Sequence, residues 1–365
     1  MVESLAVVRS LGSAHRLRTA QDVEDFEQEL LDQYLLAMVG MGVVDDTVAG
    51  ERGTLFEFLR FLGRPVWTAQ AADADRYLTW LRRDRQLSRG TIHHKAWTVG
   101  QFFDFLITRY QGDIHALTSV VVAQPIDEFN RPSKPDHSVT RVPPSTAEVT
   151  SLFGAWADAL PEARKFLPAA RDYLAASLWR RVGLRIGETA ALDIRDWRPD
   201  LGEFGKLHIR FGKGSRGRGP KTRLVPCIDG VQALLDWWFT DVRHQFGDDW
   251  SDPDAPLLPS ERRDPHTGGC LRVGADAMRS GLASAVEHWL PDWSGRLTPH
   301  GLRHYCASSL YERGLDLKAI QELLGHSWLS TTTRYIHVHS DHIERAWTTA
   351  NTRVAARFET HQNER

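Results

Sequence analysis

The side chains that could do chemistry are concentrated in the second half of this 365-residue chain. In the stretch TPHGLR, Thr298 is suited to cap a helix and Pro299 fits the first helical position. His300 and Arg303 are then three residues apart and share a face of the first turn. Because a helix N-terminus attracts anions, this group could bind a phosphate. The alternative is that His300 only caps the helix and Arg303 pairs with a carboxylate.

Three further stretches carry residues that suit the same chemistry. The segment GLRIGE holds Arg185 and Glu188, and the segment GKG holds Lys213. The segment LLGH ends at His326, and Tyr335 follows nine residues later. An arginine binds phosphate oxygens with its planar fork, whereas a tyrosine, with a reference pKa of about 10, needs help to act as a nucleophile. Taken alone, Tyr335 would more often be a packing or surface residue.

Amphipathic helices are expected to position the N-terminal part of the chain. Apolar residues recur at helical spacing over 20–40, 46–63, 69–84 and 88–109, and no strand is indicated there. A small helical bundle is the natural arrangement of such helices. Residues 125–146 then hold five prolines, which indicates an extended linker.

The second half of the chain indicates a mixed domain. The alternating segment 205–211 and the segment 221–227 are expected to pair as a β-hairpin around a glycine-rich, basic loop. Helices are expected at about 146–160, 164–183, 229–244, 272–289, 299–313, 316–325 and 341–358. The predicted fold class is mainly α with a small antiparallel β-sheet in this second domain (α+β).

Composition limits the class of protein. Hydrophobic residues make up 42% and charged residues 25%, as in ordinary folded domains. No apolar run approaches the roughly 20 residues of a membrane helix, and the N-terminus lacks a secretory stretch, so we expect a cytoplasmic protein without a membrane partner. The cysteines form no CxxC pair, so neither a disulfide framework nor a cysteine-based zinc site is indicated.

The net charge of −2 conceals two basic segments. Residues 206–223 carry seven bases and no acid, and residues 76–95 carry six bases and one acid. Local basic surfaces can hold DNA even when the far side of a protein is acidic. The alternative for each segment is an ordinary solvated face.

Taken together, the four stretches resemble the tyrosine recombinase (phage integrase) family, whose members include lambda integrase and the Xer recombinases. The family pattern is an arginine in G-L-R-x-x-E, a lysine on a β-hairpin, H-x-x-R, L-G-H and a tyrosine, and all occur here in that order. The step of 23 residues from Arg303 to His326 is also typical of the family. The resemblance is specific over residues 145–340, looser over 45–125, and does not cover 1–40.

The resemblance implies an enzyme that cleaves and rejoins DNA through a 3′-phosphotyrosyl intermediate on Tyr335. It makes Arg185 and Arg303 the pair that binds the charge of the phosphate transition state. His300 is then the candidate general base, and His326 is expected to hydrogen-bond the phosphate.

The other catalytic assignments also follow from the resemblance. Lys213 is the candidate general acid for the leaving 5′-oxygen, and Lys221 is the alternative because the basic loop is longer than in the family. Glu188 is expected to orient active-site groups from behind Arg185. The bond energy is kept in the covalent link, so no cofactor is expected. No metal site is expected either, although three histidines near the tyrosine could suggest one: His337, His339 and His342.

The resemblance and the helix pattern together divide the chain. They predict a partly helical N-terminal extension (1–40), a helical core-binding domain of the SAM-like type (41–125), a linker (126–145), a catalytic domain (146–343) and a C-terminal helix and tail (344–365). The expected partners are double-stranded DNA and further recombinase subunits, as a tetramer on DNA. The residues expected to contact DNA are Arg82, Arg83, Arg85, Arg89, Lys95, Arg216, Arg218, Lys221 and Arg223.

Other functions of the same residues remain open at this point. One alternative is a transposase or a strand transferase similar to type IB topoisomerases, and the other is a DNA-binding protein that has lost catalysis. The separate H-x-x-R and L-G-H segments disfavour the topoisomerase, and the filled catalytic positions disfavour the inactive protein. The sequence does not reveal the DNA target, nor does it distinguish integration, excision, transposition and dimer resolution.

Overall fold

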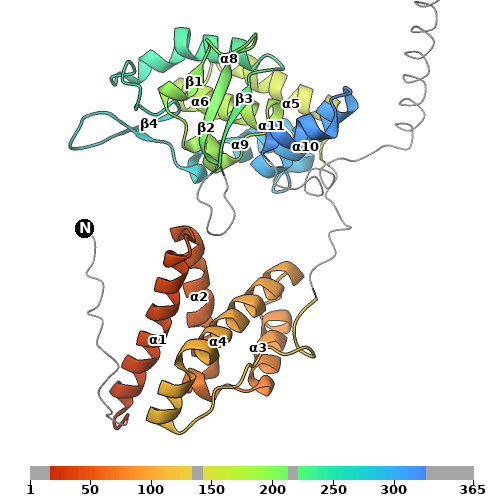
Figure 1. Ribbon diagram of the computed structural model, residues 1–365. Helices are drawn as coiled ribbons and strands as arrows, with labels where there is room; N and C mark the ends of the chain where they lie inside the picture. Colours follow the sequence, from red (N-terminus) through yellow and green to blue (C-terminus); the bar gives the residue numbers. More distant parts are fainter. Residues whose placement is uncertain (1–16, 134–142, 213–220, 326–365) are drawn as a thin grey trace, which may run out of the picture. The chain divides into compact units, whose positions relative to one another are not determined.

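The structure is a computed structural model, and the residues it describes are 17–133, 143–212 and 221–325. They divide into a helical unit, residues 17–133, and a mixed unit, residues 143–325, each of which is described by itself (Figure 1). The predicted helix at 341–358 lies outside the described residues.

Four helices and a short 3₁₀ turn make up the helical unit. They are α1 (Ala20–Gly40), α2 (Asp45–Leu62), the turn Val66–Thr68, α3 (Ala71–Arg83) and α4 (Arg89–Thr118). Side-chain caps fix two of the starts, because Thr19 accepts from the amide of Asp22 and Ser88 from that of Thr91. The four helices lie close to the predicted ranges, except that α4 continues past residue 109.

Helix α1 belongs to the bundle rather than to a separate N-terminal extension. Leu30, Leu31 and Met38 of α1 are buried in the same core as Phe58 of α2 and Phe102 of α4. The predicted division at residue 40 therefore differs from the structure, because the apolar stripe of α1 needs the bundle to cover it. Residues 1–16 of the predicted extension lie outside the described residues.

The mixed unit combines helices with two small sheets. Its elements are α5 (Thr146–Ala159), α6 (Phe166–Arg181), α7 (Ile186–Ala190), β1 (Trp197–Arg198), β2 (Lys206–Gly212), β3 (Lys221–Pro226), α8 (Val231–Trp237), β4 (Pro259–Arg263), β5 (Cys270–Arg272), α9 (Ala275–Trp289), α10 (Pro299–Glu312) and α11 (Leu317–Leu324). After α8 the chain continues as a π-helical turn, Trp238–Val242, and a 3₁₀ turn, Arg243–Phe246. The predicted fold class, mainly α with small antiparallel sheets, is confirmed.

The predicted β-hairpin is present. Strands β1, β2 and β3 pair in this order and antiparallel, with Leu207 opposite Val225 and Gly212 opposite Lys221. Leu207 and Ile209 face the core, which matches the alternation of the sequence. Strands β1, β4 and β5 and helix α7 were not predicted.

Helix α6 forms the centre of the mixed unit. Leu174, Leu178 and Trp179 are fully buried, and α8, α9 and α10 all pack against this helix. A helix buried on most sides provides a rigid base for the residues that follow it. Within the described residues, no helix has the length and apolar character to cross a membrane.

Candidate active site

The N-terminus of α10 forms as the sequence predicts. Thr298 accepts a hydrogen bond from the amide of Gly301 at 3.1 Å, and Pro299 occupies the first helical position. His300 is exposed, and its ring lies edge-on to that of His304 with 4.6 Å between the centroids. Arg303, in contrast, is only 1% exposed. The two predicted partners therefore differ in environment, with the histidine at the surface and the arginine inside.

Arg303 joins two other segments of the site. Its guanidinium donates to the carbonyl of Gly183 and, at 2.7 Å, to the carbonyl of Leu324. Gly183 has a φ of 64°, and a Cβ there would overlap Leu324 and meet Cys306. Only glycine fits this position, so the close approach of the chain before Arg185 to α10 and α11 depends on it.

Arg185 stands at the N-cap of α7. Its Nη1 donates to Oε1 of Glu188 at 2.6 Å and its Nη2 to the carbonyl of Gly325 at 3.3 Å, while its amide donates to Oε2 of Glu188 at 2.9 Å. The Arg185 side chain keeps 27% of its surface exposed. It is therefore held by protein acceptors on one side and accessible on the other.

Glu188 is buried between two arginines. Arg223 of β3 forms a two-pronged ion pair with its carboxylate, with 2.8 Å from Nη1 to Oε1 and from Nη2 to Oε2. Burial alone would raise the pKa of Glu188, but the hydrogen bonds and charges of Arg223 and Arg185 outweigh it and lower the pKa to about 2. Glu188 is thus ionised near neutral pH, and its carboxylate holds Arg185.

The ionised Glu188 should make stability depend on acid pH. Its pKa is lower in the folded chain than the ordinary 4.5, so its contribution is present above pH 4.5 and is lost as the pH falls toward 2. Between pH 5.5 and pH 3 the wild type should lose about 2 kcal/mol more of its free energy of unfolding than Glu188→Gln does. Urea unfolding of both proteins at the two pH values measures this, and equal losses would contradict the assignment.

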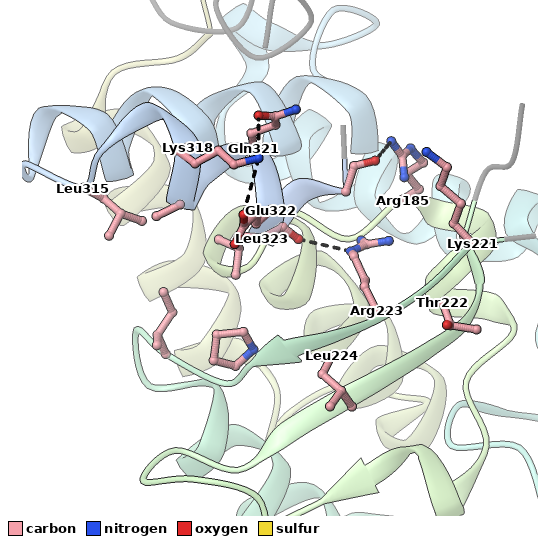
Figure 2. Close-up of a pocket in the computed structure, with 15 residues that line it drawn as sticks. Arg185, Lys221, Thr222, Arg223, Leu224, Leu315, Lys318, Gln321, Glu322 and Leu323 are labelled. Carbon is pink, nitrogen blue, oxygen red and sulfur yellow. Dashed lines mark hydrogen bonds and ion pairs between the residues drawn. The ribbon is translucent and has the colours of Figure 1, made fainter. Parts of the chain in front are cut away.

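A cleft of about 640 Å³ opens beside these residues, between β3 and α11 (Figure 2). Arg185, Arg223 and Gly325 line one part of it, and Lys221 lies at the start of β3 on the same side. Lys221, the alternative general acid, is exposed and next to the cleft. Lys213, Arg216, Arg218, His326 and Tyr335 lie outside the described residues.

The structure still shows where the chain leaves toward His326 and Tyr335. Helix α11 ends at Leu324, and its C-cap Gly325 has a φ of 65°. Arg303 and Arg185 bind the carbonyls of Leu324 and Gly325. The last described residues before the LGH histidine are therefore fixed by both predicted phosphate-binding arginines.

The predicted DNA-contact residues of the helical unit fall into two groups. Arg82, Arg83 and Arg89 are exposed. Lys95 instead pairs with Glu57 at 2.9 Å, and Arg85 lies 3.9 Å from the same carboxylate. The first group keeps its charge available to solvent, whereas the charge of Lys95 is largely used within the unit.

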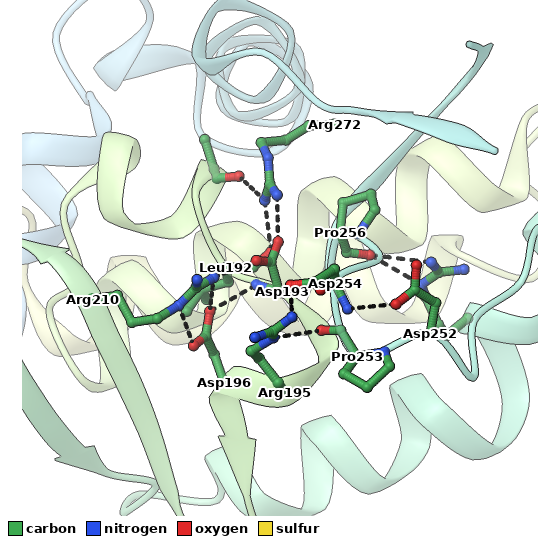
Figure 3. Close-up of polar contacts among 12 residues, drawn as sticks. Leu192, Asp193, Arg195, Asp196, Arg210, Asp252, Pro253, Asp254, Pro256 and Arg272 are labelled. Atoms are coloured by element: carbon green, nitrogen blue, oxygen red, sulfur yellow. Dashed lines mark hydrogen bonds and ion pairs between the residues drawn. The ribbon is translucent and has the colours of Figure 1, made fainter. Parts of the chain in front are cut away.

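A second cluster of charges, which the sequence did not predict, supports α7 from its C-terminal side (Figure 3). Arg272 of β5 donates to the carbonyls of Ala190 at 2.9 Å and Leu192 at 2.8 Å, and it pairs with Asp193. Arg210 of β2 pairs with both Asp193 and Asp196. The cluster therefore ties the end of the short helix that carries Arg185 to both sheets.

Arg210→Met should destabilise the protein by about 3 kcal/mol, because it deprives two largely buried carboxylates of a partner. Urea unfolding measures this loss. The matched control is Arg198→Met, also in the first sheet. Arg198 and Asp200 are both well exposed, so that variant should leave the free energy of unfolding almost unchanged. Equal losses in the two variants would show that the ion pairs of Arg210 stabilise the protein no more than an exposed pair does.

Comparisons with known proteins identify the family and the fold. The model of the phage integrase family matches residues 157–342. A tyrosine recombinase XerC from Herpetosiphon aurantiacus is 26% identical over 318 residues, which cover 86% of this chain and 92% of the relative. Two solved structures share the fold. The Tn1549 transposon integrase in complex with transposon right end DNA has a TM-score of 0.60 at 17% identity, covering 88% of this chain and 99% of that one. A lambda integrase dimer bound to a core site has a TM-score of 0.59 at 16% identity, covering 86% and 96%.

The mixed domain shares its fold with enzymes that act on DNA, and it brings two arginines and a glutamate together around the end of α11. The family match spans half of the chain, and the chain therefore belongs to the phage integrase family, as a tyrosine recombinase that carries out site-specific recombination. The family predicted from the sequence is confirmed.

Proposed function

We propose that this recombinase cleaves and rejoins double-stranded DNA with Tyr335 as its nucleophile. The phenolic oxygen attacks the phosphorus in line, a 3′-phosphotyrosyl bond forms, and the bond to the 5′-oxygen breaks. His300 takes the proton of the phenol, and Lys213 gives a proton to the 5′-oxygen, with Lys221 as the alternative donor. A 5′-hydroxyl from the partner duplex then reverses the step.

The observation that carries the proposal is the arrangement of Arg185 and Arg303. Both bind carbonyls at the last described residues of the LGH segment, and both are held by acceptors that leave their orientation little freedom. Cations fixed in advance stabilise a developing negative charge without reorganising during the reaction. This arrangement suits a phosphate that lies between the two arginines and the segment leading to Tyr335, with His326 as a further hydrogen-bond donor.

Basic side chains in both units support binding to the DNA phosphates. Arg82, Arg83 and Arg89 offer exposed guanidinium groups on the helical unit. Arg216, Arg218 and Lys221 belong to the basic segment of the hairpin. Such contacts hold the phosphate backbone without reading sequence, so binding should weaken steeply with salt. We further propose a cytoplasmic enzyme that assembles with other subunits, as a tetramer on DNA.

A nicked suicide substrate tests the proposal. The nick lets the cleaved fragment diffuse away, so the covalent adduct accumulates. We expect a DNA-linked protein whose attached nucleotide maps, by mass spectrometry of the digested adduct, to the peptide with Tyr335. No adduct would favour the inactive DNA-binding protein, and a nucleotide on another residue would overturn the assignment of Tyr335. Relaxation of supercoiled DNA without strand exchange would favour an activity of the topoisomerase type.

A further inference from the structure

Arg223 has a different environment from the other residues of the basic hairpin segment. Its side chain is only 13% exposed, and its three nitrogen atoms all donate to protein acceptors. Nη1 and Nη2 bind the two oxygens of Glu188, and Nε binds the carbonyl of Leu323 at 3.2 Å. Because the charge of Arg223 is already paired with a buried carboxylate, little of it is left for a DNA phosphate, which is the role expected from the basic segment. Arg303 differs, because the carbonyls that it binds are neutral and do not offset its positive charge.

Two glycines leave room for this guanidinium. A Cβ at Gly325 would lie 2.9 Å from both Cδ and Nη1 of Arg223. A Cβ at Gly212, on the neighbouring strand, would lie 3.3 Å from Nη1. The guanidinium therefore lies close to two glycine positions, and a side chain at Gly325 would overlap it. Such close packing indicates a fixed orientation, which an arginine that follows a mobile DNA backbone would not need.

We propose that Arg223 is a positioning residue, which holds the Glu188 carboxylate in the orientation that fixes Arg185 and joins this pair to the end of α11. The inference rests on the proposed function, because its effect on catalysis passes through Arg185. It departs from the expected DNA contact of Arg223. Figure 2 shows the geometry, with Arg223 reaching from β3 toward Leu323 beside Arg185.

The charge balance explains why Arg185 alone could not both pair with Glu188 and keep a positive charge for a phosphate. With Arg223 in place, two guanidinium groups share one carboxylate, so the group keeps a net positive charge for a phosphate. Without Arg223, the buried carboxylate would face Arg185 alone and neutralise much of its charge. Burial would also raise the pKa of Glu188 once its strongest partner was lost. Either change weakens the hold on the transition state.

The first test separates positioning from DNA contact. Arg223→Gln should lower the rate of adduct formation on the suicide substrate by roughly 10²-fold, a size typical for loss of a preorganised electrostatic contact. DNA affinity and its salt dependence should stay as in the wild type. If Arg223 instead contacts DNA, the substitution should lower the DNA affinity and reduce the slope of log affinity against log salt concentration by about one. The rate of adduct formation by the DNA-bound enzyme should then change little, and this result would overturn the inference. Lys318→Gln is the matched control, because it removes a charge from the same cleft but has no contact with Glu188.

The second test asks whether Arg223 acts through Glu188. The single variant Arg223→Gln should slow more than the wild type as the pH falls from 8 to 5, because Glu188 then begins to take up a proton. The double variant Arg223→Gln with Glu188→Gln should lose this additional sensitivity to acid, follow the pH profile of Glu188→Gln and react no more slowly than Glu188→Gln alone. Fully additive losses, or an unchanged pH profile in the single variant, would contradict the inference. Arg223→Lys, which keeps the charge but not the fork, should fall between the wild type and Arg223→Gln.

Folding and the proposed function are checked in the same series. Thermal unfolding identifies a variant that has lost its fold, and Arg223→Lys is the milder substitution for that case. If the wild type forms no adduct, the proposed function fails. The pH dependence of unfolding then tests whether Arg223 holds the Glu188 carboxylate. Arg223→Gln should lose less stability than the wild type between pH 5.5 and pH 3. If the wild type reacts and Arg223→Gln reacts equally fast, only the inference about Arg223 fails.

Discussion

Phenylalanine in place of Tyr335 is expected to reduce covalent adduct formation on the suicide substrate to below detection. The substitution removes the attacking oxygen and keeps the aromatic ring, so the proposed in-line displacement loses its nucleophile. DNA affinity should stay near that of the wild type, because the expected phosphate contacts come from the basic residues of both units. Denaturing gel electrophoresis of labelled substrate measures the adduct, and a mobility shift under native conditions measures binding.

The control for Tyr335→Phe is a tyrosine elsewhere on the catalytic unit. Tyr311 of α10 is only partly buried, and Tyr311→Phe should form the adduct at nearly the wild-type rate. An adduct that persisted in Tyr335→Phe would mean that another residue attacks the phosphate. The family resemblance of the other motifs would then have to be explained without this tyrosine as nucleophile.

Much of the fold could be predicted from the sequence because its signals are local. Apolar periodicity marked the helices of the bundle, and alternation marked the β2–β3 hairpin around its glycine-rich loop. Capping residues such as Thr298 and Ser88 fixed the starts of α10 and α4. The elements that were missed are short. Helix α7 has five residues, and β4 and β5 carry arginines where an alternating apolar pattern would be needed.

The candidate site divides in a similar way. The family resemblance implied that Arg185, Glu188 and Arg303 belong to one site, and these residues lie together around Gly183 and the end of α11. The role of Arg223 could not be predicted, because in the sequence it is one base among seven in a basic segment. Its contact with Glu188 spans 35 residues and depends on how β3 lies against α7. Local patterns carry no information on a pairing of that kind.

Lysine in place of Arg303 is the second large effect that we expect, a loss of roughly 10³-fold in the rate of adduct formation, or about 4 kcal/mol of transition-state stabilisation. Arg303 uses its fork to bind two carbonyls from different segments, those of Gly183 and Leu324. A lysine keeps one positive charge but has no planar fork, so it cannot bind both carbonyls and a phosphate oxygen in a fixed orientation. Single-turnover cleavage of the suicide substrate at saturating enzyme measures the loss.

The size of this effect depends on Arg303 being fixed rather than merely charged, and a comparison with another cation shows the difference. Arg313, at the end of the same helix, pairs with Asp229 in an exposed position. Arg313→Lys should therefore react like the wild type, since an exposed pair contributes little. If Arg303→Lys were also nearly as active as the wild type, net charge alone would suffice at this position. The carbonyls of Gly183 and Leu324 would then serve the packing of α10 against α11, and Arg185 would have to supply most of the oriented charge.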